Sequence, residues 1–268
     1  MMRDLRLPLV VTLAVLGVLA ESAWLLAQDF DRSPIRYSES TPANAISRLQ
    51  ERLIPAKRTD TTPHGYLVSV LKALEIDIDS QTLVFSKSSV QARYISQKTP
   101  RAIYFSDDVY LGWPQSGNAL EISAVDPQLG AVFYTLDQSP TDNPKFTRQG
   151  DACLNRHSAA RIGGIPGHIV RSHIVDEGGH VIPSAGIVDV DYTTPLAKRW
   201  GGWYVTGTSG AQAHLGNFCA WLSSSRSDRQ FLAGENVTSL EDRFDVKPYL
   251  SPTSDIVALM VMEYHQSS

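Results

Sequence analysis

The clearest chemical signal in this sequence is the segment Cys153-Leu154-Asn155-Arg156-His157. Covalent haem attachment uses the pattern C-x-x-C-H, in which two thiols form thioethers with the haem vinyl groups and the adjacent histidine becomes the proximal ligand. Cys153 and His157 have the required separation, but Arg156 occupies the position of the second thiol. A pattern this short, taken alone, favours a buried or disulfide-bonded cysteine beside a hydrogen-bonded histidine, with a haem tether as the alternative.

Other polar groups give weaker signals. Imidazoles together with Asp176 and Glu177 could bind zinc or copper, but no H-x3-H pair lies on an expected helix. Asp107 and Asp108 could pair as an acid and a base, although two aspartates between strands first indicate a turn. No G-x-S-x-G pattern is present around Ser209, so a serine hydrolase is not expected. The histidines considered are His157, His168, His173, His180 and His214.

Composition limits the fold and its partners. The chain has 268 residues, 43% of them hydrophobic, which is enough for the core of one large domain or two small ones. Lys and Arg number 24 against 28 Asp and Glu, so a net charge of -4 offers no basic field for nucleic acid. Cys153 and Cys219 are too few for a disulfide scaffold or a four-cysteine metal site, but they could form one bridge.

Residues 1–27 are expected to form a signal peptide or an N-terminal membrane anchor. Arg3 and Arg6 precede an apolar run from Leu7 to Ala20, whose last residues suit signal-peptidase cleavage. Glu21 ends this run short of the about 20 apolar residues that a spanning helix needs, which favours the signal peptide. A buried core helix is the remaining alternative. Both of the first two interpretations place the protein outside the cytoplasm, in the periplasm or cell envelope.

The rest of the sequence predicts a linker over residues 28–44 and a single α+β domain over residues 45–268. Apolar spacing predicts one helix from Ala45 and another from near Thr62-Pro63. Between residues 81 and 136 the hydrophobic period is two, which predicts an antiparallel sheet in the middle of the chain. The expected strands are Gln81–Ser86, Ala102–Phe105, Val109–Trp113, Leu120–Val125 and Gly130–Leu136.

The later part of the domain is expected to add a hairpin, a strand and a helix. The segments His168–Val175 and His180–Val190 flank the turn Asp176-Glu177-Gly178-Gly179, and Trp200–Thr206 has the pattern of another strand. An apolar helix from Ser254 to His265 then closes the sequence without a stop signal. We therefore interpret the domain as C-terminally truncated.

Five longer blocks are specific enough to compare with known families. They are Phe105–Gly112, Val125–Gln138, Ile165–Ser172, Arg199–Thr208 and Ser254–Glu263. With these blocks the chain, from Gln28 to His265, resembles a group of exported bacterial proteins, frequent in planctomycetes, that carry a predicted cytochrome c-like haem site and are largely uncharacterised. Two departures are Ser209, where the group usually has histidine, and the end of the last helix, which the group usually extends.

The resemblance implies a set of haem-binding residues. The group's C-x-x-C-H motif maps onto Cys153 and His157, which implies a haem c tethered by one thioether with His157 as the proximal ligand. His214 matches the group's next histidine and is the first candidate for a distal ligand, since the glycines around it would let the backbone approach a flat cofactor. The other candidates for that position are His168, His173, His265, Met260 and Met262.

The expected function is c-type haem binding for electron transfer in the periplasm or cell envelope, without substrate turnover. This makes the protein a metal-binding one that meets redox partner proteins and no nucleic acid, with possible membrane attachment through the N-terminus. The alternative is a haem-less exported structural or interaction module, a degenerate relative of the haem-binding group. Haem requires an apolar cavity of roughly 300–1,000 Å³ beside His157. The alternative predicts that Cys153 is free or paired with Cys219 and that His157 faces solvent or a polar partner, and a filled site or a Cys153–Cys219 bridge would favour it.

Overall fold

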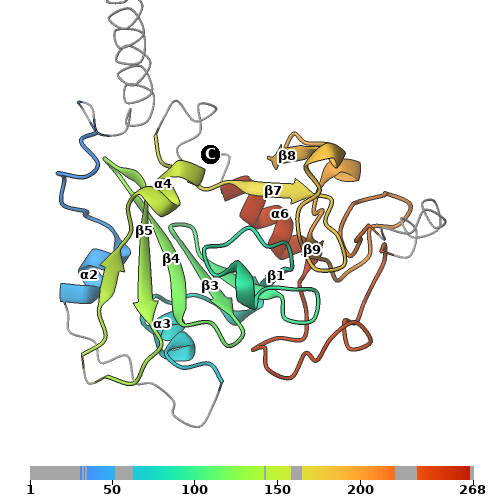
Figure 1. The fold of residues 1–268 in the computed structure, drawn as a ribbon, viewed down its shortest axis with the longest axis horizontal. Coiled ribbons are helices and arrows are strands. Elements are labelled where there is room, and N and C mark those ends of the chain that lie inside the picture. The colour runs from blue at the N-terminus through green and yellow to red at the C-terminus, as the bar shows by residue number, and fades with distance from the viewer. Residues whose placement is uncertain are drawn as a thin grey trace, which may run out of the picture.

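The computed structural model describes residues 31, 33, 35–51, 63–141, 143–157, 165–220 and 234–265. These residues form an α+β structure with a seven-stranded antiparallel sheet, a two-stranded sheet and few helices (Figure 1). The strands are β1 (Thr82–Val84), β2 (Arg101–Phe105), β3 (Val109–Pro114), β4 (Ala119–Asp126), β5 (Gly130–Asp137), β6 (Phe146–Arg148), β7 (Val170–His173), β8 (Ile187–Val190) and β9 (Trp203–Tyr204). The helices are α2 (Ala45–Glu51), α3 (Leu67–Ala73), α4 (Asp151–His157) and α6 (Ile256–His265).

The large sheet confirms the predicted antiparallel, α+β fold class. Its strand order is β6-β5-β4-β3-β2-β1-β9, so most neighbours in space are also neighbours in sequence. A short turn joins β4 to β5, where the Asp126 carboxylate accepts hydrogen bonds from the backbone N–H groups of Gln128 and Leu129. Gly130 follows with a φ of 70°, a conformation that glycine adopts without steric cost.

The pleat gives this sheet two chemically different faces. On one face Leu111 lies between Tyr104 and Ile122, and this row packs with side chains of α2 and α3 in the main core. On the other face the equivalent row contains the polar Glu121 and the side-chain-free Gly112. That second face is covered by α4, by β7 and by α6, and it contains the cavity described below (Figure 1).

A buried polar cluster fixes α6 to the body of the protein. Glu263 is fully buried, and its carboxylate accepts hydrogen bonds from Arg199 Nη1 at 2.7 Å and from Trp200 Nε1 at 2.6 Å. The apolar side of the same helix places Leu259 and Met262 in a second core cluster. Such a satisfied network orients a helix well, because either partner left alone in the interior would be costly.

Several elements differ from the sequence-based expectation in their extent. The hairpin of β7 and β8 forms, but the 3₁₀ turn Pro183–Ala185 interrupts it before β8. The strand expected at Trp200–Thr206 shrinks to β9, because Trp200 and Gly202 adopt positive φ angles of 66° and 83° and form a turn. Helix α3 begins at Leu67, later than expected, and β6 and α4 were not predicted from the sequence.

The predicted targeting segment, residues 1–27, lies outside the described residues, as does the first part of the predicted linker. Within the part of the chain that the structure describes, no helix is long and apolar enough to cross a membrane.

Candidate functional site

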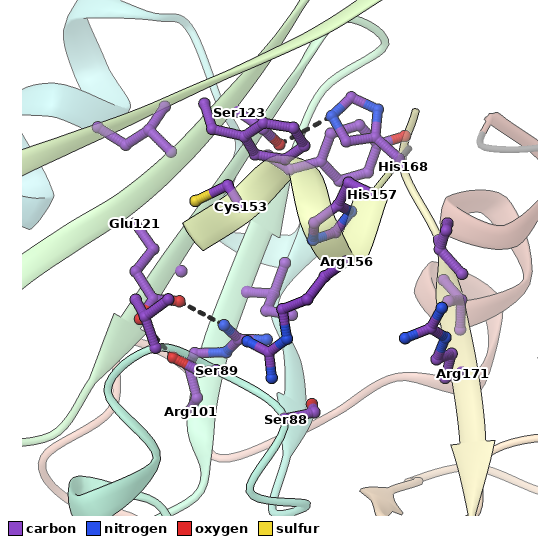
Figure 2. A pocket seen from close by; sticks show the side chains of 18 of the residues that line it. Ser88, Ser89, Arg101, Glu121, Ser123, Cys153, Arg156, His157, His168 and Arg171 are labelled. Carbon is purple, nitrogen blue, oxygen red and sulfur yellow. Dashed lines mark hydrogen bonds and ion pairs between the residues drawn. The ribbon is translucent and has the colours of Figure 1, made fainter. Parts of the chain in front are cut away.

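A cavity of about 390 Å³ lies between the second face of the large sheet and the segments that cover it (Figure 2). Its floor includes Ile103, Gly112 and Glu121, which are cross-strand neighbours on β2, β3 and β4. Aromatic side chains add apolar wall, among them Phe133 and Trp203. This volume lies in the range of small-molecule and cofactor sites.

Helix α4 presents the chemical motif of the sequence to this cavity. The Gly150 carbonyl accepts the backbone N–H groups of Cys153 and Leu154, at 3.0 and 3.1 Å, and so begins the helix. Leu154 is buried in the main core, which leaves Cys153, Arg156 and His157 on the side that lines the cavity. Residues three and four positions apart share a helix face, so the motif's spacing brings these three side chains together.

The His157 ring has a defined orientation and protonation state. Its Nδ1 lies 3.1 Å from the Gly167 carbonyl oxygen, which can only accept, so Nδ1 carries the proton and Nε2 keeps its lone pair. The ring packs against Phe133 at 4.6 Å between centroids. Burial lowers the pKa of His157 to about 4, with nearby arginines adding to the effect, so the imidazole is neutral at physiological pH.

Cys153 is half-buried and lines the same cavity as His157. Both cysteines of the chain are free, so the predicted alternative of a Cys153–Cys219 bridge is not found. Burial raises the pKa of the Cys153 thiol, and the Glu121 carboxylate raises it further. The sulfur is therefore a neutral thiol directed at a cavity, rather than an ionised nucleophile.

A second histidine lies next to His157 without having been predicted as its neighbour. His168 Nε2 lies 2.8 Å from the Ser123 hydroxyl oxygen, and its ring packs against the Tyr110 ring in a tilted arrangement with 4.2 Å between centroids. Burial lowers the pKa of His168 to about 3, and the proximity of His157 adds to this shift. Tyr110 on β3 pairs with Ser123 on β4, so the sheet register places both contacts of His168 beside the cavity.

Three arginines approach the cavity from different elements (Figure 2). Arg101 on β2 forms a 2.5 Å ion pair with Glu121, and Arg171 on β7 pairs with Asp189 at 2.9 Å. Burial favours a higher pKa for Glu121, but Arg101 and the hydrogen bond from Ser89 hold it below its usual value. Arg156 makes no hydrogen bond or ion pair with any residue that the structure describes.

The structure does not bring His214 to this cavity. Its ring lies edge-on to Trp200, with 5.2 Å between centroids, and its Nδ1 accepts the backbone N–H of Gly216 at 3.1 Å. The nearby glycines serve close packing of the chain itself, because a Cβ at Gly216 would collide with Val205 and one at Gly207 would lie 2.6 Å from Ile256. Their presence therefore does not indicate room for a flat cofactor at His214.

The prediction of a metal-binding group is wrong for the described residues. They contain no group of three or more His, Cys, Asp or Glu side chains that could hold a metal ion. His157 and His214 were the two residues predicted as metal ligands, and the packing just described separates them. The zinc or copper alternative is also wrong for the described residues, because it needs such a cluster of ligands. Asp107 and Asp108 lie in the turn between β2 and β3, as their spacing indicated.

The other predicted ligands divide between the cavity and the surface. His168, His173 and Met262 line the cavity. Met260 is exposed, and His265 Nε2 lies 3.6 Å from Asp107 Oδ1. Sequence reasoning missed Glu121, Ser123 and Arg171, although the alternation of Glu121 and Ser123 along an apolar strand was a signal that both point to one face.

Compared with models of known protein families, with curated proteins and with solved structures, the chain shows no match to any of them. Its site is therefore interpreted from its own geometry and chemistry.

Proposed function

We propose that this protein binds a haem c in the cavity beside α4, that Cys153 and His157 would hold it there, and that the protein serves in electron transfer. The observation that carries the proposal is the arrangement of His157: Nδ1 donates to the Gly167 carbonyl, and Nε2 retains its lone pair on a ring that lines the cavity. Histidines that ligate metals typically donate their second ring N–H to a backbone carbonyl or a carboxylate in this way.

The residues around the cavity fit a porphyrin. A porphyrin supplies four ring nitrogens, so one axial side chain is sufficient, which is a different requirement from the cluster of protein ligands rejected above. The cavity of about 390 Å³ has apolar wall from Ile103, Phe133 and Trp203. Cys153 and His157 line it together from one helix face, so a single short element can provide both the sulfur and the imidazole.

The chain's own groups would have defined tasks. The Cys153 thiol would add across one vinyl C=C bond, forming one S–C bond while the thiol hydrogen passes to the neighbouring vinyl carbon, so no oxidant is needed. His157 would remain neutral and correctly oriented, because burial lowers its pKa to about 4. A bound haem supplies one-electron oxidation and reduction. The apolar walls would limit the access of water to it.

The alternative, a haem-less interaction module, has less support in the geometry. It predicts that Cys153 is free or paired with Cys219 and that His157 faces solvent or a polar partner, and a filled site or a bridge between the two cysteines would favour it. A free Cys153 and the Gly167 carbonyl beside His157 fit either interpretation. The space next to His157 is a cavity, however, and the two cysteines form no bridge. Export to the periplasm or envelope remains part of the proposal, since covalent haem attachment takes place outside the cytoplasm.

The proposal is tested by producing the full chain together with haem-attachment machinery and recording its pyridine haemochrome spectrum after acid-acetone extraction. We expect an α-band between those of haem b and of haem c with two thioethers, because one vinyl group stays intact. The Cys153→Ala variant should lose its haem on extraction. Cys219→Ala, at the other free thiol, is the matched control and should keep it.

Two results would reject the proposal. One is folded wild-type protein without Soret absorption after coproduction with the attachment machinery. The other is equal retention of haem in Cys153→Ala and Cys219→Ala, because attachment would then not depend on the sulfur that lines the cavity. His157→Ala separates tethering from ligation: covalent haem should remain detectable while its absorption bands move.

A further inference from the structure

The charges around the cavity differ in sign from the charge of the whole chain. The chain carries a net charge of -4, yet Lys87, Arg101, Arg156 and Arg171 line the cavity with Glu121 as their acidic counterpart. Positive charge that gathers in a partly desolvated concavity is costly unless an anion compensates it. This contrast indicates that the cavity binds a ligand with acid groups.

Ion pairs within the protein account for only part of this charge. Arg101 is paired with Glu121 and Arg171 with Asp189. Arg156 is half-buried and makes no hydrogen bond or ion pair within the described residues, and Arg101 Nε is buried without a hydrogen-bond partner in that same part of the chain. Unused guanidinium donors at a cavity wall are suited to bind a carboxylate.

The guanidinium groups of the three arginines face the same part of the cavity. Figure 2 shows the Arg156 and Arg101 side chains next to one another, with Arg171 directed toward them from the opposite wall. Like charges that face one small space repel one another, and Glu121 is the one acidic side chain among the described residues that line it. A carboxylate placed among these arginines would remove that repulsion.

We propose that Arg156, with Arg101 and Arg171, forms an anion subsite that binds carboxylate groups on one edge of the cavity's ligand. The inference rests on the proposed function, because the edge of a haem carries two propionate carboxylates and its body is apolar. It also gives Arg156 a role at the position that the haem-attachment pattern reserves for a second thiol. The same carboxylate chemistry could come from a separate small anion, and the experiment distinguishes the two sources.

Metal-free protoporphyrin IX and its dimethyl ester provide a matched pair of probes, because they share the planar body and differ in the two acid groups. The full chain, produced without attachment machinery, is titrated with each probe while tryptophan fluorescence is followed, since Trp203 lines the cavity. We expect the diacid to bind about tenfold or more tightly than the ester, as charge-assisted hydrogen bonds predict. High salt should reduce this difference.

Arg156→Gln should weaken binding of the diacid by about tenfold and leave binding of the ester unchanged. Arg48→Gln is the matched control, since Arg48 is exposed on α2 and outside the cavity lining, and it should change neither affinity. Equal affinity of wild type for the two probes, or an unchanged affinity of Arg156→Gln for the diacid, overturns the inference. Absence of binding by either probe overturns it as well.

Inorganic phosphate serves as the probe for a separate anion. Phosphate could bind to wild type but not to Arg156→Gln, while the diacid and the ester bind equally. In that case the arginines bind a separate small anion and not the carboxylates of the porphyrin, and the inference is wrong. Failure here is distinct from failure of the proposed function, which depends on covalent haem at Cys153. A chain that retains haem covalently but does not distinguish diacid from ester refutes the anion subsite alone.

Discussion

His157 and Gly167 hold each other through two reciprocal contacts. His157 Nδ1 lies 3.1 Å from the Gly167 carbonyl oxygen, and the Gly167 N–H donates to the His157 carbonyl at 2.9 Å. The His157 ring, which lines the cavity, is thus oriented by a backbone carbonyl, and a carbonyl group does not titrate. A substitution elsewhere in the wall would therefore leave the tautomer of His157 in place.

The first prediction concerns the titration of His157. Burial lowers its pKa to about 4 from an ordinary value of 6.5, so the folded state binds fewer protons than the unfolded state between these values. The stabilisation is complete above about pH 6.5 and is lost as the pH falls toward 4, with a slope of up to about 1.4 kcal/mol per pH unit. NMR titration of the His157 ring, assigned with His157→Gln, should give a midpoint near 4, and a midpoint near 6.5 would contradict the buried arrangement.

The second prediction concerns the missing thiol. Arg156 and Cys153 lie three positions apart on α4, so Arg156→Cys places a second sulfur on the cavity side of the helix. Coproduced with attachment machinery, this variant should hold its covalent haem through two thioethers in place of one. Its haemochrome α-band should move toward that of haem c with two thioethers. An unchanged band position would mean that residue 156 does not face the bound ring.

The third prediction uses the floor of the cavity. A Cβ at Gly112 would meet Arg101 and Glu121 at 3.4 and 3.6 Å, which is ordinary contact, so Gly112→Leu is tolerated by the backbone while its side chain fills the cavity. Haem content should fall to background, and the unfolding free energy should stay within about 1.5 kcal/mol of wild type. Gly150→Leu is the control, because open space surrounds Gly150. Full haem content in Gly112→Leu would exclude this cavity as the binding site.

The fourth prediction concerns Glu263, whose shift has the opposite sign to that of His157. Burial raises its pKa to about 7, although Arg199 and Trp200 partly offset this. Since the folded state holds this proton more tightly than the unfolded state, the stabilisation is present below about pH 4.5 and is lost as the pH rises toward 7. Glu263→Gln should therefore destabilise the protein less at pH 8 than at pH 5 in urea unfolding. Equal destabilisation at pH 5 and pH 8 would show that Arg199 keeps Glu263 ionised throughout this range and would contradict the prediction.

The strands of the large sheet could be predicted because each carries its own alternating pattern. The turn between β4 and β5 is local in the same sense, since Asp126 itself accepts the hydrogen bonds that the turn needs. Contacts across the sheet were beyond reach, because they depend on the register of strands distant in sequence. The meeting of Arg101, Glu121 and Ser89 is an example.

The sequence indicated which residues of α4 belong to the candidate site, but not the residues that they contact. The haem-attachment pattern singled out Cys153 and His157, and both line the cavity, although the helix α4 that carries them was not predicted. Gly167, which sets the tautomer of His157, follows ten residues later, and no local pattern identifies it. The expectation for His214 failed to anticipate its packing because glycines indicate close approach without saying what approaches, and here it is Val205 and Ile256.

Mass spectrometry of the intact protein, coproduced with haem-attachment machinery, tests the central claim most directly. The account predicts a mass equal to the polypeptide plus one haem, and a proteolytic peptide in which the added mass resides on Cys153. Polypeptide mass alone, in protein whose circular dichroism spectrum shows the native fold, would contradict it. Haem located on a peptide that contains Cys219 would contradict it as well.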